Sequence, residues 1–270
     1  MRALVPKRRT VLPTESPAEH RRADPPIEFL QPLLDLARVS DSVIAGTVGK
    51  FTAGGGTFRI PRFIFMGPTG GGQPIRIGLF ACFHGDEWEG AEALVELFLH
   101  FERHPELVKD FHLYAYPVCN PFGFAASARR NANGCDLAAE LWRGSSQVEA
   151  YYVEREMGVH QFHGVISLHT AKNSSRFSAA CPSALLQEAV AGPALLATRR
   201  FSPAGADSAV GLAVPNGFLT ATDELRPAPF EINLAIPRLL PGPFWVQGTV
   251  AALASILHSY RNLMAFRPNI

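Results

Sequence analysis

Short apolar runs alternate along this chain with longer segments whose apolar residues recur every three to four positions. The short runs predict strands at residues 43–51, 57–66, 74–83, 111–118, 165–170 and 230–236. Helical spacing predicts a helix that includes residues 94–101 and a long amphipathic helix over residues 246–264. Strands that alternate with helices in this way predict an α/β fold, in which helices cover a central sheet.

Two more helices are expected between the later strands. Ser146 and Glu149 have the spacing of a capping box, which predicts a helix from there to about residue 159. Residues 183–198 have helical composition, with an interruption at Gly192 and Pro193, because proline blocks a helix interior.

The first forty residues differ in composition from the rest. They contain six prolines together with several arginines and lysines, which predicts an extended Pro/Arg-rich arm over residues 1–40, with one helical turn around residues 32–37, and one folded domain over residues 41–270. Apolar side chains within residues 26–39 predict that this part of the arm packs, either on the domain or on a second subunit. A homo-oligomer formed through the arm is therefore one expectation.

Composition and charge exclude several classes of protein. Hydrophobic residues make up 47% of the 270 positions, so the chain can bury a substantial core. The formal net charge of +1 provides no field for binding nucleic acid or a membrane surface. The first residues lack the apolar core of a signal peptide, and the four cysteines form no CxxC pair. These features predict a cytoplasmic protein with reduced thiols, without a nucleic-acid or membrane partner.

The sharpest local motif lies where an apolar strand ends and a helix begins. His84 and Glu87 stand three residues apart there, in the sequence His-Gly-Asp-Glu. Ligands bind beyond the carboxyl ends of strands in open α/β sheets, and imidazole and carboxylate groups are zinc ligands. The alternative is structural: His84 caps the helix, and Glu87 lies in its first turn, where a carboxylate suits the helix dipole.

Two further residues complete a candidate metal centre. His169 ends the apolar strand at residues 165–170 and is the candidate third ligand. Glu231 lies within an apolar strand, where an unpaired carboxylate is expensive to bury. A carboxylate beside a zinc-bound water has a purpose there, because it takes the proton from water and passes it to the leaving amine.

The order of the motifs resembles the zinc carboxypeptidase-like family (peptidase family M14) and, more distantly, succinylglutamate desuccinylase and aspartoacylase. The resemblance covers roughly residues 75–235 and rests on the His-x-x-Glu motif, Asn120-Pro121-x-Gly123, the run RRNANGCDL at 129–137, the strand-end His169, and Glu231. It implies a three-layer αβα fold of the phosphorylase/hydrolase-like kind, with a mixed, largely parallel sheet, and a Zn²⁺ cofactor.

The resemblance also implies a role for each matching residue. His84, Glu87 and His169 match the zinc ligands of the family. Glu231 matches its catalytic glutamate, and Arg129 matches the arginine that stabilises the oxyanion. Asp136 matches the aspartate that hydrogen-bonds the first zinc histidine.

One departure concerns substrate recognition. The family grips the substrate's free carboxylate with an Asn-Arg pair, whereas this chain has Ala138 and Ala139 at the matching positions. Alanine cannot make that charge-assisted contact. The family's mobile tyrosine also has no counterpart, because no tyrosine lies between residues 152 and 260. Arg130, Arg143 and Arg176 are the candidate replacement anchors.

Three functions fit these residues. The first is a zinc-dependent metallopeptidase, a metallocarboxypeptidase-like amidohydrolase with atypical recognition of the substrate carboxylate. The second is an N-acyl amino acid deacylase of the succinylglutamate desuccinylase/aspartoacylase type, and the third is an inactive peptidase-like binding protein. The three metal ligands and Glu231 favour an enzyme. The turn at Asn120 and the 129–137 run favour the peptidase branch, with a peptide or N-acyl amino acid as substrate.

Overall fold

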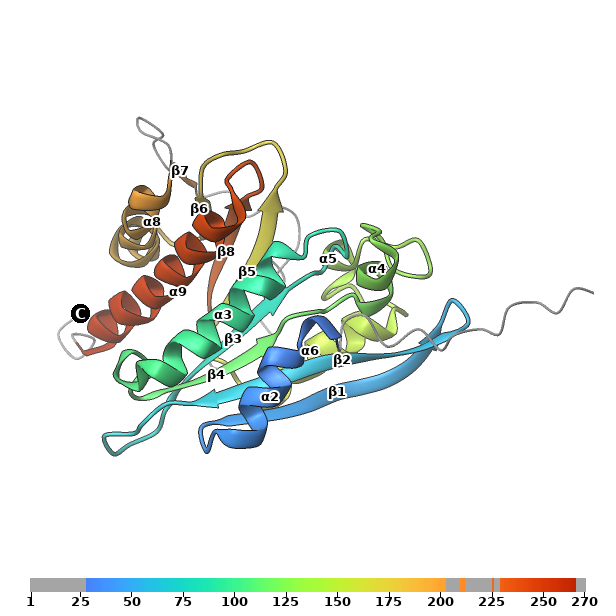
Figure 1. Cartoon of the computed structure of the whole chain (residues 1–270), viewed down its shortest axis with the longest axis horizontal. Helices are drawn as coiled ribbons and strands as arrows, with labels where there is room; N and C mark the ends of the chain where they lie inside the picture. The colour runs from blue at the N-terminus through green and yellow to red at the C-terminus, as the bar shows by residue number, and fades with distance from the viewer. Residues whose placement is uncertain (1–27, 203–208, 212–224, 226–228, 266–270) are drawn as a thin grey trace, which may run out of the picture.

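The strands form one mixed sheet in a computed structural model that describes residues 28–202, 209–211, 225 and 229–265. Within these residues the sheet has eight strands in the order β1-β2-β4-β3-β5-β8-β6-β7 (Figure 1). Their bounds are β1 Val43–Ala53, β2 Gly56–Met66, β3 Ile75–Ala81, β4 Phe111–Tyr116, β5 Gly164–Ala171, β6 Ser178–Ala180, β7 Ala209–Gly211 and β8 Phe230–Pro237. All six strands expected from the apolar runs are present. The short strands β6 and β7 were not predicted.

The four central strands β4, β3, β5 and β8 are mutually parallel. The hairpin of β1 and β2 and the short β6 add antiparallel pairs at the two sides. The prediction of a mixed, largely parallel α/β sheet is therefore confirmed. Because β3 and β5 are parallel neighbours, the segments that leave their carboxyl ends emerge side by side at one edge of the sheet.

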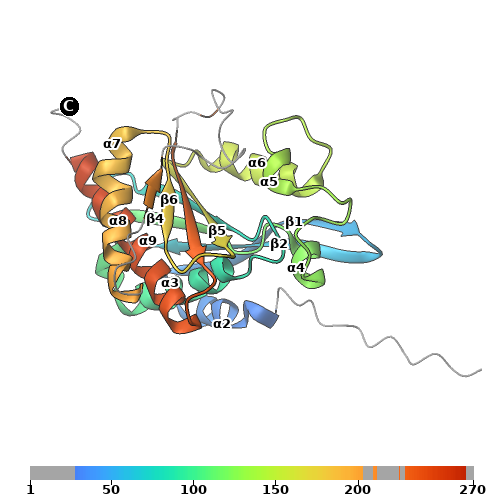
Figure 2. The ribbon, with the colours of Figure 1, turned by 90° about the horizontal axis from the view of Figure 1, so that it is seen from above.

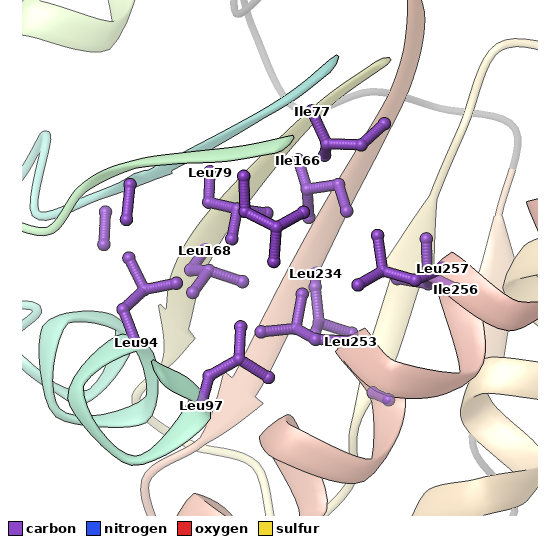
Figure 3. Packing of buried hydrophobic residues seen from close by; sticks show 14 of the residues in the cluster. Ile77, Leu79, Leu94, Leu97, Ile166, Leu168, Leu234, Leu253, Ile256 and Leu257 are labelled. Atoms are coloured by element: carbon purple, nitrogen blue, oxygen red, sulfur yellow. The ribbon is translucent and has the colours of Figure 1, made fainter. Parts of the chain in front are cut away.

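Helices cover both faces of the sheet (Figure 2). One face carries α2 (Gln31–Val39), α3 (Glu89–Arg103) and α9 (Gly242–Ala265), while α5 (Leu137–Glu140) and α6 (Val148–His160) lie over the other. Leucines and isoleucines of α3 and α9 pack on apolar side chains of β3, β5 and β8 (Figure 3). This core holds the strand ends in place. A short helix α4 (Pro121–Ala126) and a 3-10 turn η1 (Pro105–Val108) flank β4.

Two helices differ in detail from their predictions. The helix α6 starts after Gln147, whose backbone N–H donates to the Ser145 hydroxyl, so the capping box predicted at Ser146 is wrong. The region after Ser183 is helical throughout, as α7 (Ala184–Leu186), a π turn (Gln187–Ala191), α8 (Gly192–Thr198) and the 3-10 turn η3 (Arg199–Phe201). The wide π turn ends two residues before Pro193, which lies in the first turn of α8, where its missing N–H costs little.

The segment before the first strand packs on the domain. Leu30, Leu33 and Leu36 of the α2 region are buried in the main core, as the apolar side chains of residues 26–39 predicted. The rest of the arm, residues 1–27, lies outside the described residues, so its extended form and its part in oligomer formation stay predictions. None of the helices in the described part of the chain combines the length and the apolar character needed to span a membrane.

Candidate metal centre

The loop between β3 and α3 is held in a tight, buried conformation. Cys82 turns the chain with a φ of 52°, and its thiol donates to the Glu87 carbonyl at 3.0 Å. Gly85 lies against the backbone of Gly123, where a Cβ atom would come within 1.9 Å of the carbonyl carbon. Asn120 donates from its side chain to the Phe83 carbonyl at 3.2 Å. The Asn-Pro-x-Gly turn thus supports the loop that carries the candidate ligands, and only glycine fits at position 85.

Three ligand-type side chains converge at the end of the parallel strands. One donor atom from each of His84, Glu87 and His169 lies within 4.8 Å of the other two. His84 Nδ1 lies 2.9 Å from Glu87 Oε1, and His169 Nδ1 lies 3.6 Å from Glu87 Oε2. The donor set of two imidazole nitrogens and one carboxylate oxygen fits zinc, which in catalytic sites has three protein ligands and one open position. The His169 side chain is 23% exposed, so the cluster is accessible from that side.

The electrostatics of the cluster favour a cation. Burial opposes ionisation of Glu87, yet its contacts with His169 and His84 hold the pKa of this carboxyl well below its usual range. Burial also opposes protonation of His84, but the carboxylates of Glu87 and Asp136 outweigh it and raise the pKa of the imidazole. A site that stabilises a carboxylate and a protonated imidazole is a site where positive charge is favourable. A metal ion satisfies that preference in place of the proton.

Two of the other predicted residues reach the cluster. Asp136 Oδ1 lies 3.0 Å from His84 Nε2, which leaves Nδ1 of the same ring free to face Glu87 and a metal. The guanidinium of Arg129 donates to Glu87 at 3.4 Å and to Asp136 at 3.2 Å, and its side chain is 49% exposed. A half-exposed cation beside the ligands can meet a substrate oxygen there.

The position of Glu231 does not match the role predicted for it. Glu231 pairs in register with Val165 on the neighbouring parallel strand, four residues before His169. Four residues of strand span about 13 Å, which a glutamate side chain does not bridge. The residue of β8 that pairs with His169 is Ala235. This register argues against Glu231 as the base at this metal centre, because the β8 position beside His169 carries an alanine instead of a carboxylate.

Among the described residues, neither the two alanines that replace the family's carboxylate grip nor the three candidate anchor arginines form a hydrogen bond with the metal cluster. Ala138 is buried in the second core cluster and cannot face a substrate, whereas Ala139 is partly exposed. Arg130 donates to the Gly134 carbonyl at 2.6 Å, and Arg143 and Arg176 are exposed. None of the hydrogen bonds between described residues connects these three arginines to His84, Glu87 or His169. Their role in substrate binding stays a prediction.

Three residues that sequence patterns did not single out also shape the site. The backbone N–H of Thr170 donates to Glu87 Oε2 at 3.1 Å, and its hydroxyl donates to Glu89 at 2.7 Å. Glu89 in turn accepts from the guanidinium of Arg238, just beyond β8. Glu89 could have been suspected from the sequence, as a second acidic residue two positions after Glu87. Nothing in the sequence pattern pointed to Arg238, which lies 149 residues away from Glu89.

Comparison with known proteins identifies the type of fold. Neither a protein-family model nor a curated protein sequence matches the chain. Solved structures do match. A metallo-carboxypeptidase from Burkholderia cenocepacia has a TM-score of 0.68 and 15% identity, over 88% of this chain and 68% of its own.

Two more carboxypeptidase-related structures agree with this. A metallo-carboxypeptidase from Pseudomonas aeruginosa, in complex with (2-guanidinoethylmercapto)succinic acid, has a TM-score of 0.64 and 16% identity, over 85% of this chain and 68% of its own. Bovine thrombin-activatable fibrinolysis inhibitor, in complex with tick carboxypeptidase inhibitor, has a TM-score of 0.68 and 16% identity, over 88% of this chain and 97% of its own. The chain thus has the zinc metallo-carboxypeptidase fold that the motif order predicted, with a candidate His-Glu-His metal site.

Proposed function

We propose that this protein is a zinc-dependent hydrolase of a peptide or amide bond. The observation that carries the proposal is the convergence of His84, Glu87 and His169 within 4.8 Å, at the strand ends of a metallo-carboxypeptidase fold. Zinc bound by these three side chains supplies Lewis acidity for the attack of water on an amide carbonyl.

The chain's own residues then have separate tasks. Asp136 holds the His84 ring in orientation through Nε2. Arg129, which lies over Glu87 and Asp136, donates to the oxygen that becomes negative in the transition state. The candidate base is Asp86, in the ligand loop itself. Its Oδ2 pairs with Lys172, while its Oδ1 has no hydrogen-bond partner among the described residues.

The substrate is a peptide or an N-acyl amino acid whose carboxylate is not gripped in the usual way. Because Ala138 and Ala139 cannot make a bidentate contact, we expect matched peptides with free and amidated C-termini to be cut at similar rates. Charge-assisted contacts contribute a few kcal/mol, so a working grip would separate these rates by roughly two to three powers of ten. Ala139→Arg should raise the preference for the free carboxylate. If the wild type already cuts the free-carboxylate peptide about a hundredfold faster than the amidated one, the size of effect expected of a carboxylate grip, another arginine is the anchor.

A second candidate function is metal-dependent binding without turnover. The specific observation that favours it is Ala235, which occupies the strand position beside His169 and is partly exposed. An acidic residue introduced there would lie next to the metal. If the wild type lacks a base, Ala235→Glu should create or raise hydrolytic activity. Asp86→Asn should then leave the hydrolysis rate unchanged.

Metal analysis followed by a hydrolysis screen tests the proposal. We expect about one zinc per chain in the wild type. His84→Ala and His169→Ala should each lose it, while an exposed control, Arg176→Ala, should keep it. Stoichiometric tight zinc in either histidine variant would show that the ion binds elsewhere. Zinc binding without hydrolysis of any peptide or N-acyl amino acid would favour the binding function.

A further inference from the structure

An ion pair with a buried carboxylate lies next to the candidate metal ligands, between Glu89 and the partly exposed Arg238. Glu89 is the first residue of α3, two positions after Glu87, and it is only 1% exposed. Both of its carboxylate oxygens accept from Arg238, through Nε and through Nη2, the latter at 2.7 Å. A fork-to-fork contact of this kind fixes direction as well as distance. A carboxylate buried to this degree requires such a partner.

The same guanidinium also holds the ligand loop. Nη2 of Arg238 donates to the backbone carbonyl of Asp86 at 2.6 Å, between the two candidate ligands His84 and Glu87. The backbone N–H of Arg238 donates to the Ala171 carbonyl at 3.2 Å, just beyond the third candidate ligand. Arg238 therefore contacts both segments that supply ligands, although it follows a third strand.

Thr170 connects the ion pair to a ligand carboxylate. Its hydroxyl donates to Glu89 at 2.7 Å, while its backbone N–H donates to Glu87 Oε2 at 3.1 Å. Thr170 is thus a hydrogen-bond partner of both Glu89 and the candidate ligand Glu87, and it directly follows His169 in sequence. A shift of Glu89 would move Thr170 and, with it, the carboxylate that contacts both histidines.

We infer that the Arg238–Glu89 pair positions the ligand loop for metal binding by fixing His84 and Glu87 relative to His169. Arg238 is a positioning residue, because its contacts reach the ligands only through the loop backbone and Thr170. This inference rests on the metal site that the proposed function requires. It predicts that zinc affinity depends on a pair of side chains that do not touch the ion.

The test measures the zinc dissociation constant by competition with a chromophoric chelator. Arg238→Met should weaken zinc binding by about 10- to 100-fold, the usual effect of losing a group that orients a metal ligand. The visible spectrum of the cobalt-loaded protein should change as well, because the geometry of the ligands changes. Circular dichroism confirms that each variant is folded.

A double variant separates positioning from mere stability. Arg238→Met alone leaves Glu89 buried without its partner, which can prevent folding. Glu89→Leu together with Arg238→Met replaces the pair with apolar side chains and removes that problem. If the pair positions the loop, zinc binding stays weak in the double variant, since the contacts to Asp86 and Thr170 are still missing.

A second ion pair with a buried carboxylate and a partly exposed arginine is the matched control. Arg62 and Glu156 are joined at 2.9 Å between β2 and α6, and Glu156 is similarly buried. Arg62→Met should lower stability and leave the zinc dissociation constant unchanged.

Two results would overturn the inference in distinguishable ways. Wild-type affinity in the double variant would show that the pair is only structural, with the metal site intact. A wild type that binds no zinc would overturn the metal site, and the role of Arg238 with it.

Discussion

Replacing either of two buried glutamates on the helix α6 by glutamine is expected to change the folding stability in different ways. Glu156 lies 2.9 Å from both the Arg62 guanidinium and the Tyr116 hydroxyl, and 3.2 Å from His160. Burial opposes its ionisation, but these three contacts outweigh burial and lower the pKa of Glu156 from 4.5 to about 2. Burial raises the pKa of Glu149, seven residues earlier, and outweighs its hydrogen bonds with its own backbone and with Asn131, the latter at 3.5 Å.

The shift of Glu156 sets the size of the effect. A fall in pKa from 4.5 to about 2 corresponds to roughly 3 kcal/mol of folding free energy, at about 1.4 kcal/mol per pH unit. Because the folded-state pKa is depressed, this stabilisation is fully present above pH 4.5 and is lost as the pH falls toward 2. Glu156→Gln should therefore be destabilised by roughly 3 kcal/mol at pH 7 and by much less near pH 2.

Urea denaturation of the wild type and the two variants at pH 7, 4 and 2.5 measures this. Glu149→Gln is the matched control, because it removes the same charge from the same helix at a site that disfavours it. We expect its stability at pH 7 to stay within about 1 kcal/mol of the wild type or to rise. A Glu156→Gln variant as stable as the wild type at pH 7 would refute the reasoning. So would a loss of the same size at every pH.

Three further predictions concern the metal centre. Asp136→Asn should weaken zinc binding by roughly 10- to 100-fold, measured by chelator competition, because the carboxylate that orients His84 is lost; unchanged affinity would contradict this. Zinc affinity should fall at acidic pH, beginning above pH 6.5, because the raised pKa of His84 makes protons compete with the metal; a pH-independent dissociation constant between pH 5.5 and 7.5 would argue against it. Glu231→Gln should leave turnover on any cleaved substrate nearly unchanged, and a drop of several powers of ten would show that Glu231 is the base.

The sequence by itself determined the order of the six longer strands and all three candidate ligands. Apolar runs marked the strands because a central strand buries both faces, and this pattern is local. His84, Glu87 and His169 could be found because each lies at or just beyond the end of such a run, and parallel strands bring their carboxyl ends to one edge. The order of motifs also predicted the fold, which the solved structures bear out.

Only the tertiary structure decided which residues meet. The offset between β5 and β8 places Ala235, and not Glu231, beside His169. That offset follows from packing between strands 66 positions apart, and no periodicity within one strand encodes it. The contact of Arg238 with Glu89 has the same origin, because a residue just past one strand meets the start of a helix that follows another. Local pattern specifies the type of each element, whereas long-range packing specifies the register between elements, and the register sets which side chains share the site.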